Sequence, residues 1–156
     1  MLFRSILDPR PLDSVWPAAV WPPVASAVLT GDYVELRRSE PSDGAELFAA
    51  LDDAEVWRHL RSQPNSAADV TELISQRLQT DGWFPWTVRL LQPIAGLKEG
   101  AIVGTTSFMD CSPLDARVEI GSTSYARSVW GTAVNPDCKL LLLQFAFEQQ
   151  IGRAHV

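Results

Sequence analysis

The segment that decides the fold is VEIGSTSYARSVWGTAVNPDCKLLLLQFAFE, Val118–Glu148. Its first part alternates like a strand, a short turn containing Gly131 follows, and apolar residues then recur at helical spacing. Asparagine is a strong N-cap and proline fits the first helical position, so the sequence predicts a helix that begins at Asn135-Pro136. Apolar side chains lie nearly all round this helix, so we expect it to be buried against a sheet. The exceptions expected to face water are Lys139, Gln144 and Glu148.

A strand that runs through a tight turn into a helix leaves backbone N–H groups pointing out of the helix start. Together with the positive end of the helix dipole, these groups form a site for an anion. An ordinary strand–turn–helix corner without a ligand carries the same local pattern, because turns with a single glycine are common. The local sequence alone therefore leaves both interpretations open.

The wider pattern resembles one family. Glu119-Ile-Gly121, then Trp130-Gly-Thr-Ala-Val-Asn135, then Lys139 and a run of leucines are similar to the acetyl-CoA-binding segment of the GCN5-related N-acetyltransferases, the GNAT family. The resemblance is closest to the RimJ/RimL-like branch, which includes enzymes that acetylate ribosomal proteins. It covers the chain from Val28 to Gln150 and is strongest over the last third.

The general signature of that family is Gln/Arg-x-x-Gly-x-Gly/Ala. Trp130, Ala133 and Asn135 stand at its three defined places, so the chain departs from the signature at the first and third places and carries alanine at the second. The form Thr-x-Val-Asn-x-x-x-Lys found here is instead similar to one subset of the RimJ/RimL-like branch.

The composition of the chain limits which classes of protein it can belong to. The chain has 156 residues, of which 46% are hydrophobic and 21% charged, as expected of one soluble globular domain. A net charge of -6 argues against a nucleic-acid partner, because phosphate backbones attract clustered Lys and Arg. Two cysteines, Cys111 and Cys138, form neither a disulfide framework nor a metal-ligand pattern, so we expect no metal. Prolines interrupt the apolar run Val15–Leu29, so we expect no membrane span and a cytoplasmic location.

The two ends match translated adapter DNA. The codons ATC-GGA-AGA-GCA-CAC-GTC of a widely used sequencing adapter encode Ile151–Val156, and the reverse complement encodes Met1–Ser5 from a GTG start. Our hypothesis is that both segments are adapter-derived. The alternative, a native Ile151–Val156, stays open because family members often carry Leu-Gly-x-x-Arg-Val there. We expect residues 1–27 to form an extended Pro/Trp-rich arm and residues 28–150 an incomplete N-acetyltransferase domain.

Ahead of the deciding segment, the pattern predicts a strand, two helices joined by a short loop, and two further strands. This β-α-α-β-β-β-α order is typical of an α+β fold and not of a Rossmann alternation. The resemblance implies a partial GNAT fold, with a mostly antiparallel central sheet, helices on both faces and the last strands missing. The predicted elements are a strand at Tyr33–Arg37, a helix that begins at Ser39–Pro41, a turn of helix within Asp52–Gln63, a helix capped by Pro64–Ser66, and strands at Trp86–Gln92, Ala101–Met109 and Arg117–Tyr125.

The resemblance also implies where acetyl-CoA binds. A bulge in the strand before the turn exposes backbone donors to the acetyl group and the pantetheine, and counting back from the turn places it near Ser124, Tyr125 and Ala126. Arg127 is a candidate phosphate contact, although an exposed arginine at a strand end is commonly just solvated. Asn135 adds a side-chain donor unless it caps its own helix. Backbone N–H groups implied to hold the pyrophosphate are those of Trp130, Gly131, Thr132, Ala133, Val134 and Asn135.

Glu119 is the candidate general base. It lies eleven residues before Trp130, the spacing of the base glutamate in histone-acetylating relatives. The alternatives are that Glu119 lies on a solvated face or pairs with Arg117, and that His59 is the base. Residues that line the amine pocket, or simply pack at the edge of the core, are Trp57, Trp83 and Phe84.

The resemblance implies an enzyme that transfers the acetyl group of acetyl-CoA to a primary amine, either a protein N-terminus or a small molecule. It also implies that the missing C-terminal part carries one wall of the cleft and often the general acid, so we expect the fragment itself to be inactive. The alternative function is a non-catalytic acyl-CoA or nucleotide sensor on the same fold. Neither the amine acceptor nor the oligomeric state follows from the sequence.

Overall fold

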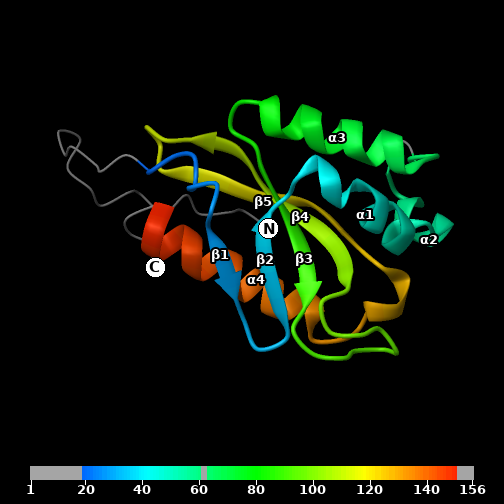
Figure 1. Cartoon of the computed structure of the whole chain (residues 1–156). Coiled ribbons are helices and arrows are strands. Elements are labelled where there is room, and N and C mark those ends of the chain that lie inside the picture. The colour runs from blue at the N-terminus through cyan, green and yellow to red at the C-terminus, as the bar shows by residue number, and fades with distance from the viewer. Residues whose placement is uncertain (1–18, 61–62, 151–156) are drawn as a thin grey trace, which may run out of the picture.

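A five-stranded antiparallel sheet organises the computed structural model, which describes residues 19–60 and 63–150 (Figure 1). The strands are neighbours in chain order, and helices cover both faces, so the fold is α+β. The strands are β1 (Val28–Thr30), β2 (Val34–Arg38), β3 (Phe84–Leu90), β4 (Ile102–Ser112) and β5 (Arg117–Tyr125). The helices are α1 (Gly44–Leu51), α2 (Ala54–Trp57), α3 (Ala67–Gln79) and α4 (Val134–Phe145), with short helical turns at Pro41–Asp43, Arg127–Val129 and Ala146–Gln150.

The predicted order of elements is confirmed, with one addition. β1 was not predicted; this three-residue strand pairs with β2, and only its middle residue, Leu29, is buried. The two segments that we interpret as adapter-derived, and most of the expected arm, lie outside the described residues. At the described end of the arm, the Ala19 amide donates to the Pro113 carbonyl at 2.9 Å, and Trp21 packs against the core.

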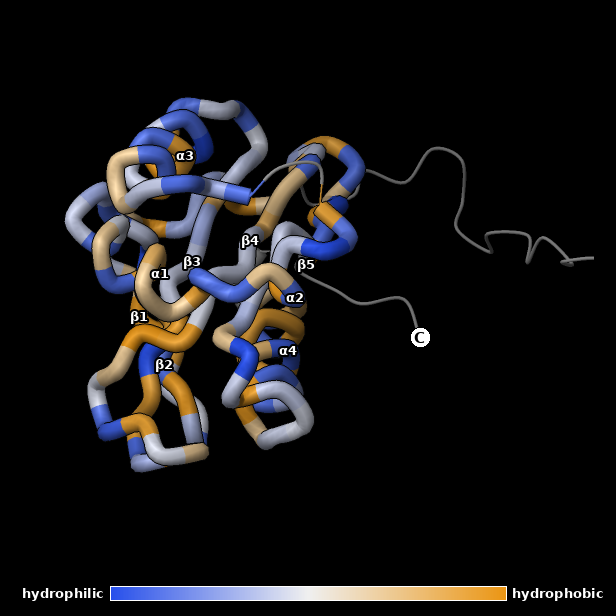
Figure 2. The backbone as a smooth tube through the Cα atoms, turned by 90° about the vertical axis from the view of Figure 1, so that its right-hand side faces the viewer, coloured by the Kyte–Doolittle hydropathy of each residue, from blue (hydrophilic) through white to orange (hydrophobic). Residues whose placement is uncertain are grey.

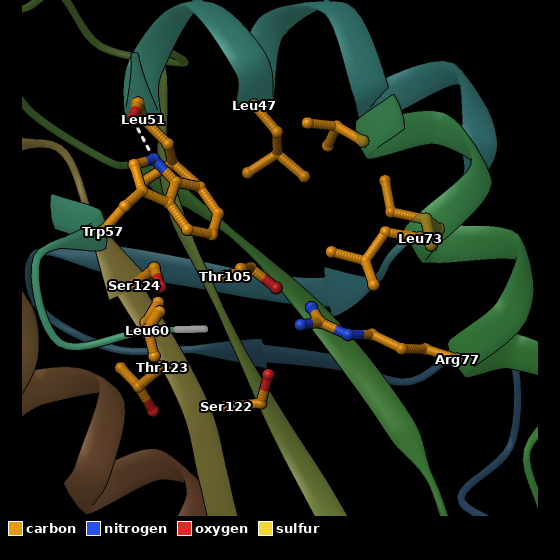
Figure 3. Close-up of a pocket in the computed structure, with 12 residues that line it drawn as sticks. Leu47, Leu51, Trp57, Leu60, Leu73, Arg77, Thr105, Ser122, Thr123 and Ser124 are labelled. Atoms are coloured by element: carbon orange, nitrogen blue, oxygen red, sulfur yellow. Dashed lines mark hydrogen bonds between the residues drawn. The ribbon is translucent and has the colours of Figure 1, made fainter. Parts of the chain in front are cut away.

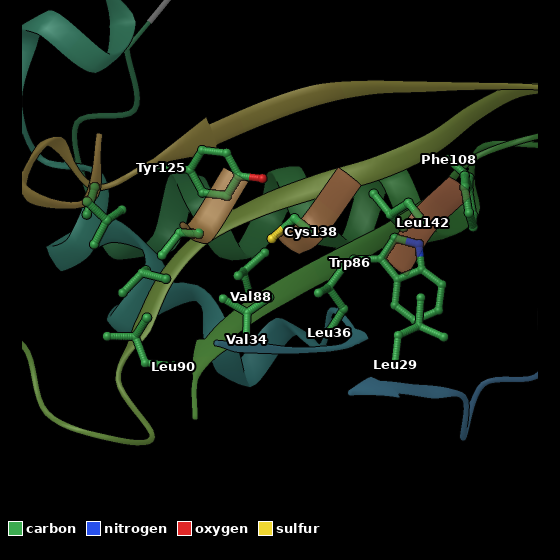
Figure 4. Packing of buried hydrophobic residues seen from close by; sticks show 14 of the residues in the cluster. Leu29, Val34, Leu36, Trp86, Val88, Leu90, Phe108, Tyr125, Cys138 and Leu142 are labelled. Carbon is green, nitrogen blue, oxygen red and sulfur yellow. The ribbon is translucent and has the colours of Figure 1, made fainter. Parts of the chain in front are cut away.

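The larger core lies between the sheet and α4 (Figure 4). Trp86 at its centre is fully buried and meets the rings of Phe108 and Phe145 edge-on, with centroid distances of 6.0 Å to each. Cys138 of α4 is buried beside Tyr125, and this burial raises the pKa of the Cys138 thiol to about 11. Cys138 therefore fills space in the core.

A smaller core lies on the opposite face, where α1 and α3 cover β4. Leu47 and Leu51 of α1 pack there against Val70 and Ile74 of α3, and both pairs recur at helical spacing. The N-terminus of α3 is capped by Ser66, whose hydroxyl accepts a hydrogen bond from the Asp69 amide at 3.2 Å.

The start of α4 differs from the prediction. The helix begins at Val134, and its N-cap residue is Ala133, so the predicted start, with Asn135 as N-cap and Pro136 as first helical residue, is wrong by two residues. The hydroxyl of Thr132 accepts from the Val134 amide at 3.4 Å, which supplies the side-chain acceptor expected from Asn135. Pro136 is tolerated at the third helical position because N–H groups of the first turn have no partner within the helix.

Asp137 fixes α4 against the sheet. Its buried carboxylate accepts from the amides of Tyr33 and Val34, at 2.8 and 3.0 Å, in the hairpin between β1 and β2. Gly31 leaves the space for this contact, because a Cβ there would lie 2.4 Å from Asp137 Oδ2. The first turn of α4 is therefore held in a defined position relative to the strands.

Candidate active site

A bulge interrupts β5 just before its end. Gly121 pairs with Ser107 and Ser124 pairs with Thr105, so Ser122 and Thr123 both lie opposite Thr106. Ser122 takes a left-handed conformation with φ of 47°. The bulge therefore lies directly before the stretch from Ser124 to Ala126 in which it was predicted.

The free edge of β5 carries a donor next to this bulge. The Ala126 amide donates to the Val103 carbonyl at 2.8 Å, and Ser124 faces Thr105 across the ladder. Because successive residues of an antiparallel strand point their backbone groups in alternate directions, the N–H of Tyr125 points away from β4. The carbonyl of Tyr125 points the same way and accepts from Trp130 Nε1 at 2.9 Å.

The turn between β5 and α4 has alternating bonded and free N–H groups. Those of Trp130, Thr132 and Val134 donate to acceptors within the turn at 3.2, 3.3 and 3.4 Å. Within residues 19–60 and 63–150, the N–H groups of this turn without an acceptor are those of Gly131, Ala133 and Asn135. Half of the six predicted pyrophosphate donors are thus available to a ligand, and they lie at the positive end of α4.

A cavity of about 440 Å³, which we name the turn cavity, joins this turn to the bulge. Its lining includes Thr123 and Tyr125 of β5, Gly131 of the turn, and Asn135 and Lys139 of α4. Lys139 was expected to face water, and this is wrong: the side chain is half-buried and Nζ donates to Thr123 Oγ1 at 2.9 Å. Burial lowers the pKa of Lys139. A cation and several free donors therefore line one space.

A second cavity of about 210 Å³, the helix cavity, lies between the sheet and helices α1 to α3 (Figure 3). Trp57, a candidate for the amine pocket, lines it, and its Nε1 donates to the Leu51 carbonyl at 2.7 Å. Trp83 and Phe84 do not line this cavity; they border a different hollow beside Trp21. Thr123 and Ser124 line both the turn cavity and the helix cavity, so both cavities border the bulge.

The comparison with family models shows to which protein family this chain belongs. Residues 34–156 match the family described as "Acetyltransferase (GNAT) domain". This chain is a member of the GNAT family. GNAT enzymes are acetyltransferases that use acetyl-CoA as co-substrate and act on amine acceptors, and the predicted family is confirmed.

Solved structures show the same fold. A probable GNAT acetyltransferase from Chromobacterium violaceum is 22% identical with a TM-score of 0.76, covering 93% of this chain and 71% of that one. A GCN5-related N-acetyltransferase from Brucella melitensis is 22% identical with a TM-score of 0.72, covering 85% of this chain and 59% of that one. An acetyltransferase from Salmonella typhimurium, described as modifying the N-terminal serine of ribosomal protein L7/L12, is 15% identical with a TM-score of 0.61, covering 77% and 68%.

The GNAT domain described here therefore spans less than two thirds of the Brucella structure. No curated protein matches the sequence. In residues 19–60 and 63–150, no helix has the length and apolarity to cross a membrane, and no cluster of three or more His, Cys, Asp or Glu side chains is placed to hold a metal ion.

Six of the predicted site residues line neither cavity of this GNAT domain, namely Glu119, Ala126, Arg127, Thr132, Ala133 and Val134. Glu119 is exposed on β5, on the same strand face as Gly121, and the described residues include no ion pair between it and Arg117. Arg127 lies 3.7 Å from a carboxylate oxygen of Glu55, and its guanidinium stacks 4.6 Å from the centroid of the Trp130 ring. His59 is exposed and lines neither cavity.

Two polar residues of the site were missed. Lys139 follows Asn135 by four residues, which places both on one helix face, so the helical period alone could have brought Lys139 to the turn. Arg77 follows Leu73 and Ile74 by four and three residues, which places a basic side chain on the buried face of α3. A cation at a core-facing position is the signal that could have identified Arg77.

Proposed function

We propose that this GNAT domain binds acetyl-CoA in the turn cavity and transfers the acetyl group to a primary amine held in the helix cavity. The observation that carries this proposal is that the two cavities share Thr123 and Ser124 at the bulge of β5. If the thioester of acetyl-CoA lay at the bulge, the rest of the CoA would lie in the turn cavity and the attacking amine in the helix cavity.

The turn supplies contacts suited to the pyrophosphate. The free amides of Gly131, Ala133 and Asn135 face an approaching anion, and the α4 dipole adds positive potential. Asn135 does not cap α4, so its side-chain amide is available as a further donor. The outward N–H of Tyr125 suits a carbonyl of the pantetheine arm, which would lie along β5.

Acetyl transfer needs a held thioester and a neutral amine. The amine nitrogen attacks the thioester carbonyl carbon, a C–N bond forms, the C–S bond breaks, and the CoA thiolate leaves. Backbone donors at the bulge would stabilise the negative charge on the carbonyl oxygen. The proton lost by the ammonium passes to a base, for which we propose Glu119 acting through water along the open surface beside Gly121.

We further propose that the complete protein adds a wall to this cleft and, with it, the acid that protonates the thiolate. β5 is the last strand of the described sheet, and the Brucella structure is longer than the part that this chain spans. The Salmonella structure supports a protein N-terminus as one class of acceptor and a place near the RimJ/RimL-like branch.

Glu119→Gln tests the proposed reaction in the complete protein. We expect the turnover number to fall about 100-fold or more, as for loss of a general base, with acetyl-CoA affinity unchanged. Release of free CoA thiol measures turnover, and calorimetric titration measures affinity. Glu99→Gln, at an exposed turn far from both cavities, is the matched control.

The exposure of Glu119 outside both cavities is the observation that favours a second function, a non-catalytic acyl-CoA sensor. A sensor would bind acetyl-CoA and release no thiol with any amine. Full turnover in Glu119→Gln would instead remove Glu119 from the mechanism.

A further inference from the structure

We infer that the helix cavity takes a small primary amine that also carries a carboxylate, and that Arg77 binds this carboxylate. The inference rests on the proposed function, because it names the acceptor class of the same site. Arg77 extends from α3 toward Thr105 and Ser122 on the strand side of the cavity (Figure 3).

Among residues 19–60 and 63–150, no carboxylate pairs with Arg77. Its Nε is buried without a hydrogen-bond partner, and none of the residues that line the cavity is an Asp or Glu. The guanidinium lies 5.5 Å from the centroid of the Trp83 ring, which holds its position without neutralising it. Burial lowers the pKa of Arg77, and no described carboxylate acts against this shift.

Several described arginines form ion pairs, whereas Arg38 and Arg117, like Arg77, have none among the described residues, and neither of these two lines the helix cavity. The pairs in the described residues include Arg37 with Glu35, Arg58 with Glu55 and Arg89 with Asp43. Arg77 is half-buried, with a buried Nε. Partial burial of a cation without a counter-ion has a desolvation cost, and a bidentate carboxylate relieves that cost with two parallel hydrogen bonds. The unpaired position of Arg77 is therefore suited to an anionic group brought by a ligand.

The rest of the cavity sets the size and polarity of that ligand. Apolar side chains, including Leu47, Leu51 and Leu73, form most of its helix side. The hydroxyls of Ser122 and Ser124 lie at the opposite side, next to the bulge where the thioester is proposed to sit. A volume of about 210 Å³ beneath three helices fits a compact amino acid better than a polypeptide chain.

Paired probes test this inference in the complete protein. The probes are leucine, 6-aminohexanoate and the amides of both, so each pair differs only in the carboxylate. We expect the carboxylate of at least one pair to bind about 10-fold or more tightly than its amide, and Arg77→Gln to reduce this preference below about threefold. Arg77→Lys keeps the charge without the bidentate geometry and should retain part of the preference.

Equal affinity for acid and amide, binding of no carboxylate, or tighter binding of a serine-initiated peptide would overturn the inference. So would a preference that survives in Arg77→Gln. Acetyl-CoA affinity, measured in the same samples, separates the two proposals. A wild-type protein that does not bind acetyl-CoA would overturn the proposed function. If acetyl-CoA binds but no carboxylate is preferred, only the proposed acceptor class is wrong. A native melting curve and an alkylation-resistant Cys138 show that each variant is folded.

Discussion

Ala133→Asp is expected to weaken acetyl-CoA binding about 100-fold, equivalent to roughly 3 kcal/mol. Ala133 lies between two other residues with free amides, at the start of α4. A carboxylate there would stand beside the proposed pyrophosphate and would repel it, and it would also compete for the free N–H groups. Calorimetric titration with acetyl-CoA measures the loss.

Ala133→Asn is the matched control for this substitution. Its side chain has nearly the same shape without the charge, so affinity should stay within a few-fold of the wild-type value. Unchanged affinity in a correctly folded Ala133→Asp protein would exclude the turn as the phosphate site.

The 156-residue chain on its own is expected to self-associate and to show no acetyltransferase activity. Leu140, Leu143 and Phe147 form an apolar row at the C-terminal half of α4 and the turn after it, with exposed fractions of 53%, 45% and 43%. Figure 2 shows how hydrophobic residues mark much of this helix. Burying each such side chain is worth about 1.5–3 kcal/mol, and β5 has a free edge that can pair with another strand. Self-association would bury the apolar row and pair the free edge of β5.

Three simultaneous substitutions separate this row from other exposed residues. Leu140→Gln, Leu143→Gln and Phe147→Ser together should shift the chain toward monomer in sedimentation velocity. Leu114→Gln should leave association unchanged, because Leu114 is 87% exposed in a turn away from α4. A wild-type chain that is monomeric, melts sharply and is stabilised by acetyl-CoA would contradict the expectation.

Local sequence was sufficient where local interactions decide the structure. β5 has the predicted bounds, Arg117–Tyr125, because neighbouring residues determine both its alternating pattern and the turns at its ends. The cap of α3 at Ser66 is equally local. The turn before α4 was predicted as a candidate anion site for the same reason, since a strand, a tight turn and a helix follow one another without interruption.

Contacts between distant residues were not accessible in this way. The strand β1 forms because it pairs with β2, and three residues carry too little pattern to reveal it. The resemblance implied a bulge near Ser124, but its left-handed residue, Ser122, is neither glycine nor asparagine, so the residue pattern alone does not place it. Lys139 was assigned to water because it interrupts an apolar run, whereas in the fold it reaches Thr123 on a neighbouring element. The helical period places Arg77 on the buried face of α3, but only the tertiary structure shows that, among the described residues, no carboxylate pairs with it.

Hydrogen exchange of individual amides, with and without acetyl-CoA, tests the central claim most directly. The claim predicts that exchange slows at Gly131, Ala133 and Asn135, whose N–H groups are free in the unliganded turn, and at Tyr125 on the edge of β5. Amides of this turn that are already bonded, such as those of Thr132 and Val134, should change less. Acetyl-CoA that binds without slowing exchange at these four amides, and protects a different surface instead, would contradict the account.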